Sequence, residues 1–211
     1  LPFIESGDKI VCMLPIAHAY GLAFEILNTI SLGCHIHFLG KPPSPQVLLE
    51  MFSKVKPKLV LAVPLIIEKI VNRSVLPKLQ QGAAKTLVKV PLLNSVVYSK
   101  VRASMIKFFG GELVEVVIGG AALNPDVEKF LRKIRFPYTV GYGMTECGPL
   151  ISYAYWTKYK ERSSGKVVDR MEVKIDSDDP QNIVGEILAR GSNVMLGYYK
   201  NEEATKQTFT E

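Results

Sequence analysis

A group of chemically capable side chains follows a short apolar run in the second half of the chain. The segment GYGMTE, residues 141–146, brings an aromatic ring, a hydroxyl and a carboxylate close together. Tyr142 offers a ring face for a nucleobase, Thr145 a donor for an anionic oxygen, and Glu146 a ligand for a hard cation such as Mg²⁺. This set suits a metal-bound nucleotide better than it suits a hydrophobic core.

The elements that position these side chains are predicted from apolar runs that end at a glycine, a proline or a polar residue. The predicted strands cover residues 10–14, 35–39, 59–63, 113–118 and 138–140. The predicted helices cover residues 21–30, 44–55, 65–71 and 125–134, and a longer helical stretch covers 76–109. The helix over 125–134 has the clearest start, because Asn124 suits the N-cap and Pro125 the first helical position.

The alternation of strands and helices predicts an α/β fold with a mostly parallel sheet flanked by helices. Strand 113–118, helix 125–134 and strand 138–140 form one βαβ unit, so the two strands are parallel. Their carboxyl ends lie on one edge, which brings GGAA (residues 119–122) beside GYGMTE. Ligands of open α/β sheets bind at this edge, and the strands that end near Leu14 and Val63 should open there too.

The sequence becomes polar and charged after about residue 155. We predict two parts: residues 1–155 as a nucleotide- and acyl-binding α/β subdomain, and residues 156–211 as a small β-rich subdomain that is incomplete at its end. Strands over 171–176 and 186–190 and a short helix after Asn201 belong to the second part. Tyr198 and Tyr199 are interpreted as packing residues between the two parts.

Composition sets mild limits. The chain has 211 residues, 47% of them hydrophobic, and a net charge of +6 from scattered basic residues, which favours a solvated surface over a nucleic-acid footprint. Its three cysteines contain no CxxC pair, which indicates a reduced, cytoplasmic protein. No signal peptide is recognisable, and the longest apolar run, 59–67, is too short to span a bilayer. Peripheral membrane contact and the oligomeric state stay open.

Four segments together resemble the adenylate-forming superfamily of acyl-CoA synthetases, luciferases and nonribosomal peptide adenylation domains. They are LPIAHAYG (14–21), GGAAL (119–123), GYGMTE (141–146) and GEILARGSNVMLGYYKNEEAT (185–205), in the order of the family. The segments AVPLIIEKI (62–70) and VYSKVRASM (97–105) look most like long-chain fatty acid–CoA ligases.

The resemblance implies a two-step reaction that uses ATP, Mg²⁺ and coenzyme A. A carboxylate, here of a fatty acid, attacks the α-phosphorus of ATP, and the thiol of CoA then attacks the acyl-adenylate. By the family pattern, Tyr142 stacks on adenine, Thr145 holds a phosphate oxygen, and Glu146 binds the metal. The other nucleotide-binding residues that the pattern implies are Gly119, Gly120, Ala121, Gly143 and Met144. His18 lies beside the carboxylate and the acyl entrance, or has a structural role.

The resemblance also implies parts that this sequence does not include. The phosphate loop of the family is expected before Leu1, and the ribose-binding aspartate and the lid lysine are expected after Glu211. We therefore expect the chain to be an internal piece that does not turn over by itself. The alternative is a non-catalytic scaffold or nucleotide-binding relative with the same fold. A zinc site at Cys34, His35 and His37 is less favoured than a buried strand, because no fourth ligand is evident.

Overall fold

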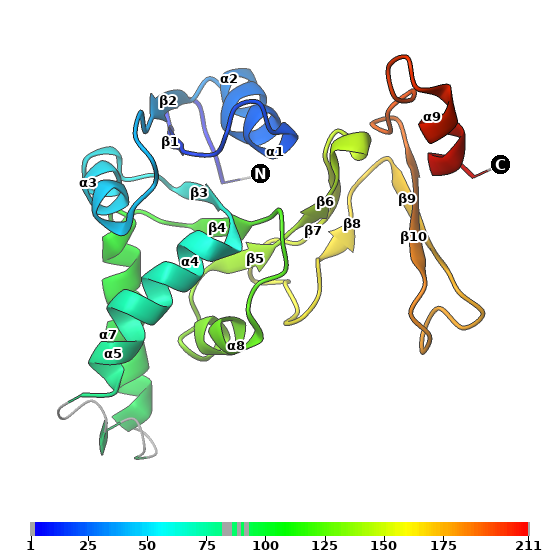
Figure 1. The fold of residues 1–211 in the computed structure, drawn as a ribbon. Helices are drawn as coiled ribbons and strands as arrows, with labels where there is room; N and C mark the ends of the chain where they lie inside the picture. Colours follow the sequence, from blue (N-terminus) through cyan, green and yellow to red (C-terminus); the bar gives the residue numbers. More distant parts are fainter. Residues whose placement is uncertain (1–2, 82–85, 88–89, 91–92, 211) are drawn as a thin grey trace.

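The computed structural model describes residues 3–81, 86–87, 90 and 93–210. It has an α/β part built on parallel strands, followed by antiparallel strands and a short C-terminal helix (Figure 1). The predicted fold class, α/β with parallel strands flanked by helices, is confirmed.

The parallel strands form two sheets. β1 (Lys9–Cys12) pairs with β2 (His35–Phe38), and β4 (Glu115–Ile118) lies between β3 (Leu59–Ala62) and β5 (Tyr138–Val140). Four of these strands fall within a predicted strand, and β1 begins one residue before the strand predicted over 10–14. All the pairings within these two sheets are parallel, so β3, β4 and β5 have their carboxyl ends on one edge, as the βαβ prediction requires.

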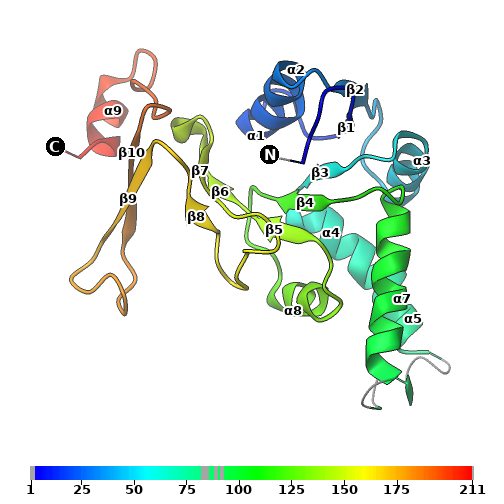
Figure 2. The ribbon, with the colours of Figure 1, turned by 180° about the vertical axis from the view of Figure 1, so that it is seen from behind.

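Helices cover the β3–β4–β5 sheet and bury a common core with it (Figure 2). They are α3 (Pro45–Val55), α4 (Pro64–Ile70), α7 (Leu93–Phe108) and α8 (Pro125–Lys133). Ser44 caps α3 by accepting from the Val47 N–H at 3.3 Å, and Asn124 caps α8 by accepting from the Asp126 N–H at 2.9 Å. Phe52 of α3 has no exposed surface, and its truncation to alanine would cost about 3–5 kcal/mol.

The long helical stretch predicted over 76–109 is only partly described. A π-helical segment, η2 (Val71–Val75), continues α4 into α5 (Leu76–Leu79), and α7 accounts for the last part of the predicted stretch. Residues 82–85, 88–89 and 91–92 of this stretch lie outside the described residues.

The helix predicted over 21–30 is interrupted by a wider turn. It runs as α1 (Ala19–Gly21), the π-helical segment η1 (Leu22–Leu27) and α2 (Asn28–Ser31). The Asn28 N–H bonds to the Ala23 carbonyl, five residues back, and the Thr29 hydroxyl donates to the Phe24 carbonyl at 3.1 Å. Wide turns of this kind are frequent at functional sites, and this one lies directly beside the cavity described below.

The antiparallel part begins earlier than expected. β6 (Tyr142–Gly143), β7 (Leu150–Tyr153) and β8 (Lys166–Val167) form one sheet, whose strands come from both sides of residue 155. The division into 1–155 and 156–211 therefore stays a prediction. β9 (Met171–Asp176) and β10 (Glu186–Gly191) form the predicted pair of strands, with α9 (Glu202–Thr208) after them. This hairpin extends away from the parallel sheets in both views (Figures 1 and 2).

Two expectations about burial are wrong. β2 is not a buried strand: its ends are exposed, with Phe38 57% accessible, because its only partner among the described strands is β1. Tyr199 is 87% exposed and is not a packing residue. Among the described residues, no helix is long and apolar enough to cross a bilayer, and no group of three potential metal ligands occurs.

Candidate active site

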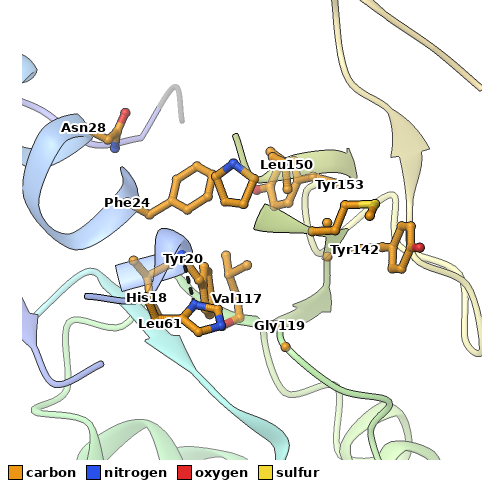
Figure 3. Close-up of a pocket in the computed structure, with 15 residues that line it drawn as sticks. His18, Tyr20, Phe24, Asn28, Leu61, Val117, Gly119, Tyr142, Leu150 and Tyr153 are labelled. Atoms are coloured by element: carbon orange, nitrogen blue, oxygen red, sulfur yellow. Dashed lines mark hydrogen bonds between the residues drawn. The ribbon is translucent and has the colours of Figure 1, made fainter. Parts of the chain in front are cut away.

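A cavity of about 260 Å³ lies at the carboxyl ends of the parallel strands (Figure 3). It is lined by residues from β3, β4, the loops that follow β4 and β5, the helix after β1, and β7: His18, Tyr20, Phe24, Asn28, Leu61, Val117, Gly119, Gly120, Gly141, Tyr142, Gly143, Met144, Pro149, Leu150 and Tyr153. Most of the surface that lines the cavity is apolar. Sheet topology thus brings together segments that are far apart in the sequence.

The loops after β4 and β5 lie side by side, as predicted. The Gly119 N–H donates to the Ala62 carbonyl at 3.0 Å, and the Gly141 N–H donates to the Ile118 carbonyl at 2.9 Å. These bonds extend the ladders of the sheet past the ends of its strands. The GGAA and GYGMTE segments therefore open onto the same cavity, which is the placement that the βαβ unit predicts.

The glycines of these loops have different reasons to lack a side chain. Gly120 has a φ of +86°, where only glycine is unstrained, although a Cβ there would meet only an ordinary contact with Val63 at 3.8 Å. A Cβ on Gly119 would instead lie 3.2 Å from the Tyr20 ring, and one on Gly143 would lie 2.0 Å from the Pro149 carbonyl oxygen. Backbone conformation thus explains the glycine at position 120, and protein packing explains the other two.

The segment LPIAHAYG forms a tight turn between β1 and α1. His18 caps the helix, since its Nδ1 accepts from the Tyr20 N–H at 3.2 Å (Figure 3). The Tyr20 hydroxyl donates to the Val117 carbonyl at 3.0 Å. A Cβ on Gly21 would lie 2.7 Å from the Pro15 carbonyl oxygen, so the turn requires glycine there.

Glu25, which the sequence analysis did not single out, binds the backbone at the start of this turn. Its Oε2 accepts from the Met13 N–H at 3.1 Å and from the Leu14 N–H at 2.9 Å, and the residue has no exposed surface. Burial raises the pKa of Glu25, although these two amide donors oppose the shift. Glu25 is the single charged residue of the helix predicted over 21–30, and this was the available signal.

The GYGMTE loop turns into a single 3₁₀ turn, η3 (Thr145–Cys147), and is held from the C-terminal part of the chain. The Tyr198 hydroxyl donates to Glu146 Oε1 at 2.7 Å, and this bond lowers the pKa of the Glu146 carboxyl. The Met195 N–H donates to the Glu146 carbonyl at 2.7 Å, and the Asn193 amide donates to the carbonyls of Cys147 and Leu150. The sequence analysis missed this role of Tyr198.

A buried carboxylate lies behind one wall of the cavity. The Tyr153 hydroxyl donates to Glu115 Oε2 at 2.6 Å, and the Trp156 N–H donates to Glu115 Oε1 at 2.7 Å. Glu115 has no exposed surface, and desolvation raises the pKa of its carboxyl to about 7 in spite of these two donors. Since Tyr153 lines the cavity, Glu115 is hydrogen-bonded to a residue of that wall.

The predicted site residues divide into two groups. Those that line the cavity are His18, Gly119, Gly120, Tyr142, Gly143 and Met144. Ala121, Thr145 and Glu146 follow in the same loops but are not among its lining residues. Ala121 and Thr145 are exposed, and Glu146 is half-buried with its carboxylate on Tyr198. The Glu146 carboxylate is therefore not packed in an apolar interior.

These residues fit a nucleotide and its Mg²⁺. Tyr142 is 36% exposed and lies at the end of the cavity away from Asn28, where its side chain is accessible to a base (Figure 3). Mg²⁺ is usually held by one or two carboxylates together with substrate phosphates. Glu146 supplies one carboxylate, and the described residues contain no cluster of three metal-ligating side chains. The arrangement thus fits a metal that arrives with phosphates rather than a cage made by protein alone.

Comparison with known proteins agrees with this geometry. Residues 2–199 match the family model described as AMP-binding enzyme. A long-chain-fatty-acid–CoA ligase of Mycobacterium bovis is 27% identical over 99% of the chain, and a 4-coumarate–CoA ligase of Solanum tuberosum is 30% identical over 98% of it. The chain covers 36% and 34% of these two proteins, so it spans about a third of their length.

Solved structures share the fold. An O-succinylbenzoate coenzyme A synthetase from Bacillus subtilis, in complex with AMP, superposes with a TM-score of 0.73 at 20% identity, covering 100% of this chain and 38% of that one. A benzoate CoA ligase from Burkholderia xenovorans also gives a TM-score of 0.73, at 17% identity, over 99% of this chain and 38% of that one.

Proposed function

Because the chain belongs to the AMP-binding enzyme family, we propose that it carries the nucleotide- and acyl-binding site of an AMP-forming acid–CoA ligase. One observation carries the proposal: the GGAA loop, the GYGMTE loop and His18 line a single cavity. A nucleotide whose base lies on Tyr142 and an acid whose carboxylate lies near His18 would meet between these loops.

In the first step, an oxygen of the acid attacks the α-phosphorus of ATP, and the bond to the leaving pyrophosphate breaks. His18 is suited to hold the attacking carboxylate. Its Nδ1 accepts from the Tyr20 N–H, so the neutral ring carries its proton on Nε2 and can donate to a carboxylate oxygen. Two anions approach each other in this step, and fixed donors that offset their charge lower its barrier.

Thr145 and Glu146 serve the phosphates in this proposal. Thr145 is exposed at the start of η3 and can donate its hydroxyl to a phosphate oxygen. Glu146 would hold Mg²⁺, which supplies Lewis-acid stabilisation of the developing charge when bound. The bond from Tyr198 leaves the second carboxylate oxygen of Glu146 for the metal and keeps the carboxyl ionised. In the second step, the thiol of CoA attacks the acyl carbon, which gives a thioester and AMP.

A long-chain fatty acid is the proposed acid. The apolar lining of the cavity, formed by side chains such as Phe24, Leu61 and Leu150, supports a hydrocarbon substrate. An aromatic acid would bury a similar surface, and relatives named for both kinds of acid are about equally similar to this chain. ATP–pyrophosphate exchange by the full-length protein, measured with a panel of fatty and aromatic acids, separates the two. Exchange with aromatic acids alone would overturn the fatty-acid proposal.

The nucleotide site is tested by AMP binding to the 211-residue chain, measured by calorimetry. Replacing Tyr142 with alanine removes a stacking surface worth about 1–3 kcal/mol, so the affinity should fall by about 5- to 150-fold. Tyr142→Phe keeps the ring and should bind as the unmodified chain does. Equal binding by Tyr142→Ala and the unmodified chain would refute the placement of the base. AMP binding without pyrophosphate exchange in the full-length protein would instead indicate a non-catalytic relative.

A further inference from the structure

A second cavity, of about 360 Å³, lies between α7 and the end of α8. We call it the basic cavity. Its lining residues are Asn94, Ser95, Tyr98, Ser99, Arg102, Lys133, Ile134 and Arg135. Because Lys133 ends α8 and the chain then enters the amino end of β5, this cavity lies on the opposite edge of the sheet from the candidate active site. It is a separate place in the fold.

Three cationic side chains line the basic cavity, and the described residues that line it include no acid. Arg102, Lys133 and Arg135 make no ion pair with any described residue. The nearby acids Glu112 and Glu128 pair with Lys56 and Arg162 instead. The Nε of Arg102 is buried and has no hydrogen-bond partner. A buried, unsatisfied donor on a charged group is unfavourable, and no described residue provides an acceptor for this nitrogen.

The remaining lining groups also favour an anion. Lys133 is held against the cavity wall, with its Nζ 4.9 Å from the centroid of the Tyr98 ring. Asn94 and Ser99 add an amide and a hydroxyl from the same helix as Arg102. Residues that carry donors thus line this cavity both from α7 and from the C-terminal end of α8.

The simplest competing explanation is the helix dipole, because cations at a helix C-terminus are favourable. This effect is worth about 0.3–1 kcal/mol and falls off within the last turn. It accounts for Lys133 and Arg135 at the end of α8. It does not account for Arg102, which belongs to α7, or for the burial of its Nε without an acceptor.

We propose that the basic cavity binds the phosphate group of a small soluble phosphate ester. A guanidinium group can donate two parallel hydrogen bonds to phosphate oxygens, and Arg102 and Arg135 both carry one. Lys133 contributes a point charge, and the neutral donors complete the shell around the oxygens. The proposal is independent of the ligase function, since the two cavities share no lining residue.

The test is a titration of the 211-residue chain with inorganic phosphate at constant ionic strength, followed by the side-chain Nε–H resonance of Arg102 in proton–nitrogen NMR spectra. We expect saturable binding that shifts this resonance. Arg102→Gln and Arg135→Gly should each weaken phosphate binding by roughly tenfold or more. Arg135 has a φ of +54°, which glycine adopts without strain, so Arg135→Gly should fold at least as well as the unmodified chain.

Two controls locate the binding. Lys129→Gln removes the same charge from α8 at a position that does not line the cavity, and Tyr142→Ala alters the candidate active site; neither should change phosphate binding at Arg102. Vesicles of phosphatidylcholine with phosphatidic acid test a lipid source of the phosphate. Binding to these vesicles without binding of inorganic phosphate would overturn the proposal, as would equal phosphate binding by Arg102→Gln and the unmodified chain.

Discussion

Glu115 should make the stability of the fold depend on pH near neutrality. The carboxyl is fully buried at the start of β4, and desolvation raises its pKa from 4.5 to about 7. A carboxyl whose pKa is higher in the folded state favours folding most below its unfolded pKa. That contribution is lost as the pH rises through the folded pKa, because a charge must then be kept in the interior. The window of change therefore lies between about pH 4.5 and pH 7.

The size of the effect follows from the shift. One pKa unit corresponds to about 1.4 kcal/mol, and the shift of Glu115 converts to about 3 kcal/mol over the whole window. Between about pH 5 and pH 8, where the protein can be handled, about 2–3 kcal/mol of this should be lost. Glu115→Gln removes the titration. Its amide can still accept from the Trp156 N–H and can donate to the Tyr153 oxygen, so the contacts survive.

The assay is urea unfolding of the unmodified chain and of Glu115→Gln at several values in this pH range. The difference in unfolding free energy between the two isolates Glu115, because other titrating groups are common to both. We expect Glu115→Gln to gain about 2–3 kcal/mol relative to the unmodified chain on going from about pH 5 to about pH 8. Tyr153→Phe removes a donor that lowers the pKa of Glu115, so its midpoint should move to higher pH. Parallel curves for Glu115→Gln and the unmodified chain would refute the reasoning.

Two further predictions concern the GYGMTE loop. Gly143→Ala should destabilise the fold by about 1–3 kcal/mol, since its Cβ would lie 2.0 Å from the Pro149 carbonyl oxygen. Gly141→Ala is the control and should cost less, because its Cβ meets only ordinary contacts from 3.4 Å. Thermal unfolding of both variants measures the difference, and equal losses of stability would contradict the clash. Tyr198→Phe should raise the pKa of Glu146 toward its ordinary value, because the hydroxyl bond that lowers it is gone. The carboxyl carbon shift of Glu146 in an NMR pH titration reports this pKa. Tyr199→Phe is the matched control, and a pKa unchanged in Tyr198→Phe would remove the assigned cause.

The parallel strands were predictable because each is a short apolar run with clear ends. The core of every predicted strand formed, from Lys9–Cys12 to Tyr138–Val140. The cap at Asn124 was predictable for a similar reason, since its side chain bonds only to the next turn of the chain. Local rules suffice for such features.

Contacts that depend on distant segments were not predictable. Glu25 looked like an ordinary helical carboxylate, and its bonds to Met13 and Leu14 depend on how the helix packs against β1. Tyr198 reaches Glu146 across 52 positions of sequence. β6 was missed because a strand of two residues is too short to show an alternating pattern, and β7 pairs with β6 and with β8, which is equally short. In each case the missing information was the three-dimensional placement of a partner.

The contact between Tyr20 and Gly119 ties two motifs into one unit. Tyr20 belongs to LPIAHAYG and Gly119 to GGAAL, yet a methyl group on Gly119 would press on the phenol ring at 3.2 Å, while the phenol hydroxyl is tied to the Val117 carbonyl. The Tyr20 N–H in turn donates to the His18 imidazole, so a larger residue at position 119 that displaces Tyr20 would also displace His18. A larger residue at position 119 should therefore be tolerated best when residue 20 is also changed to a smaller one.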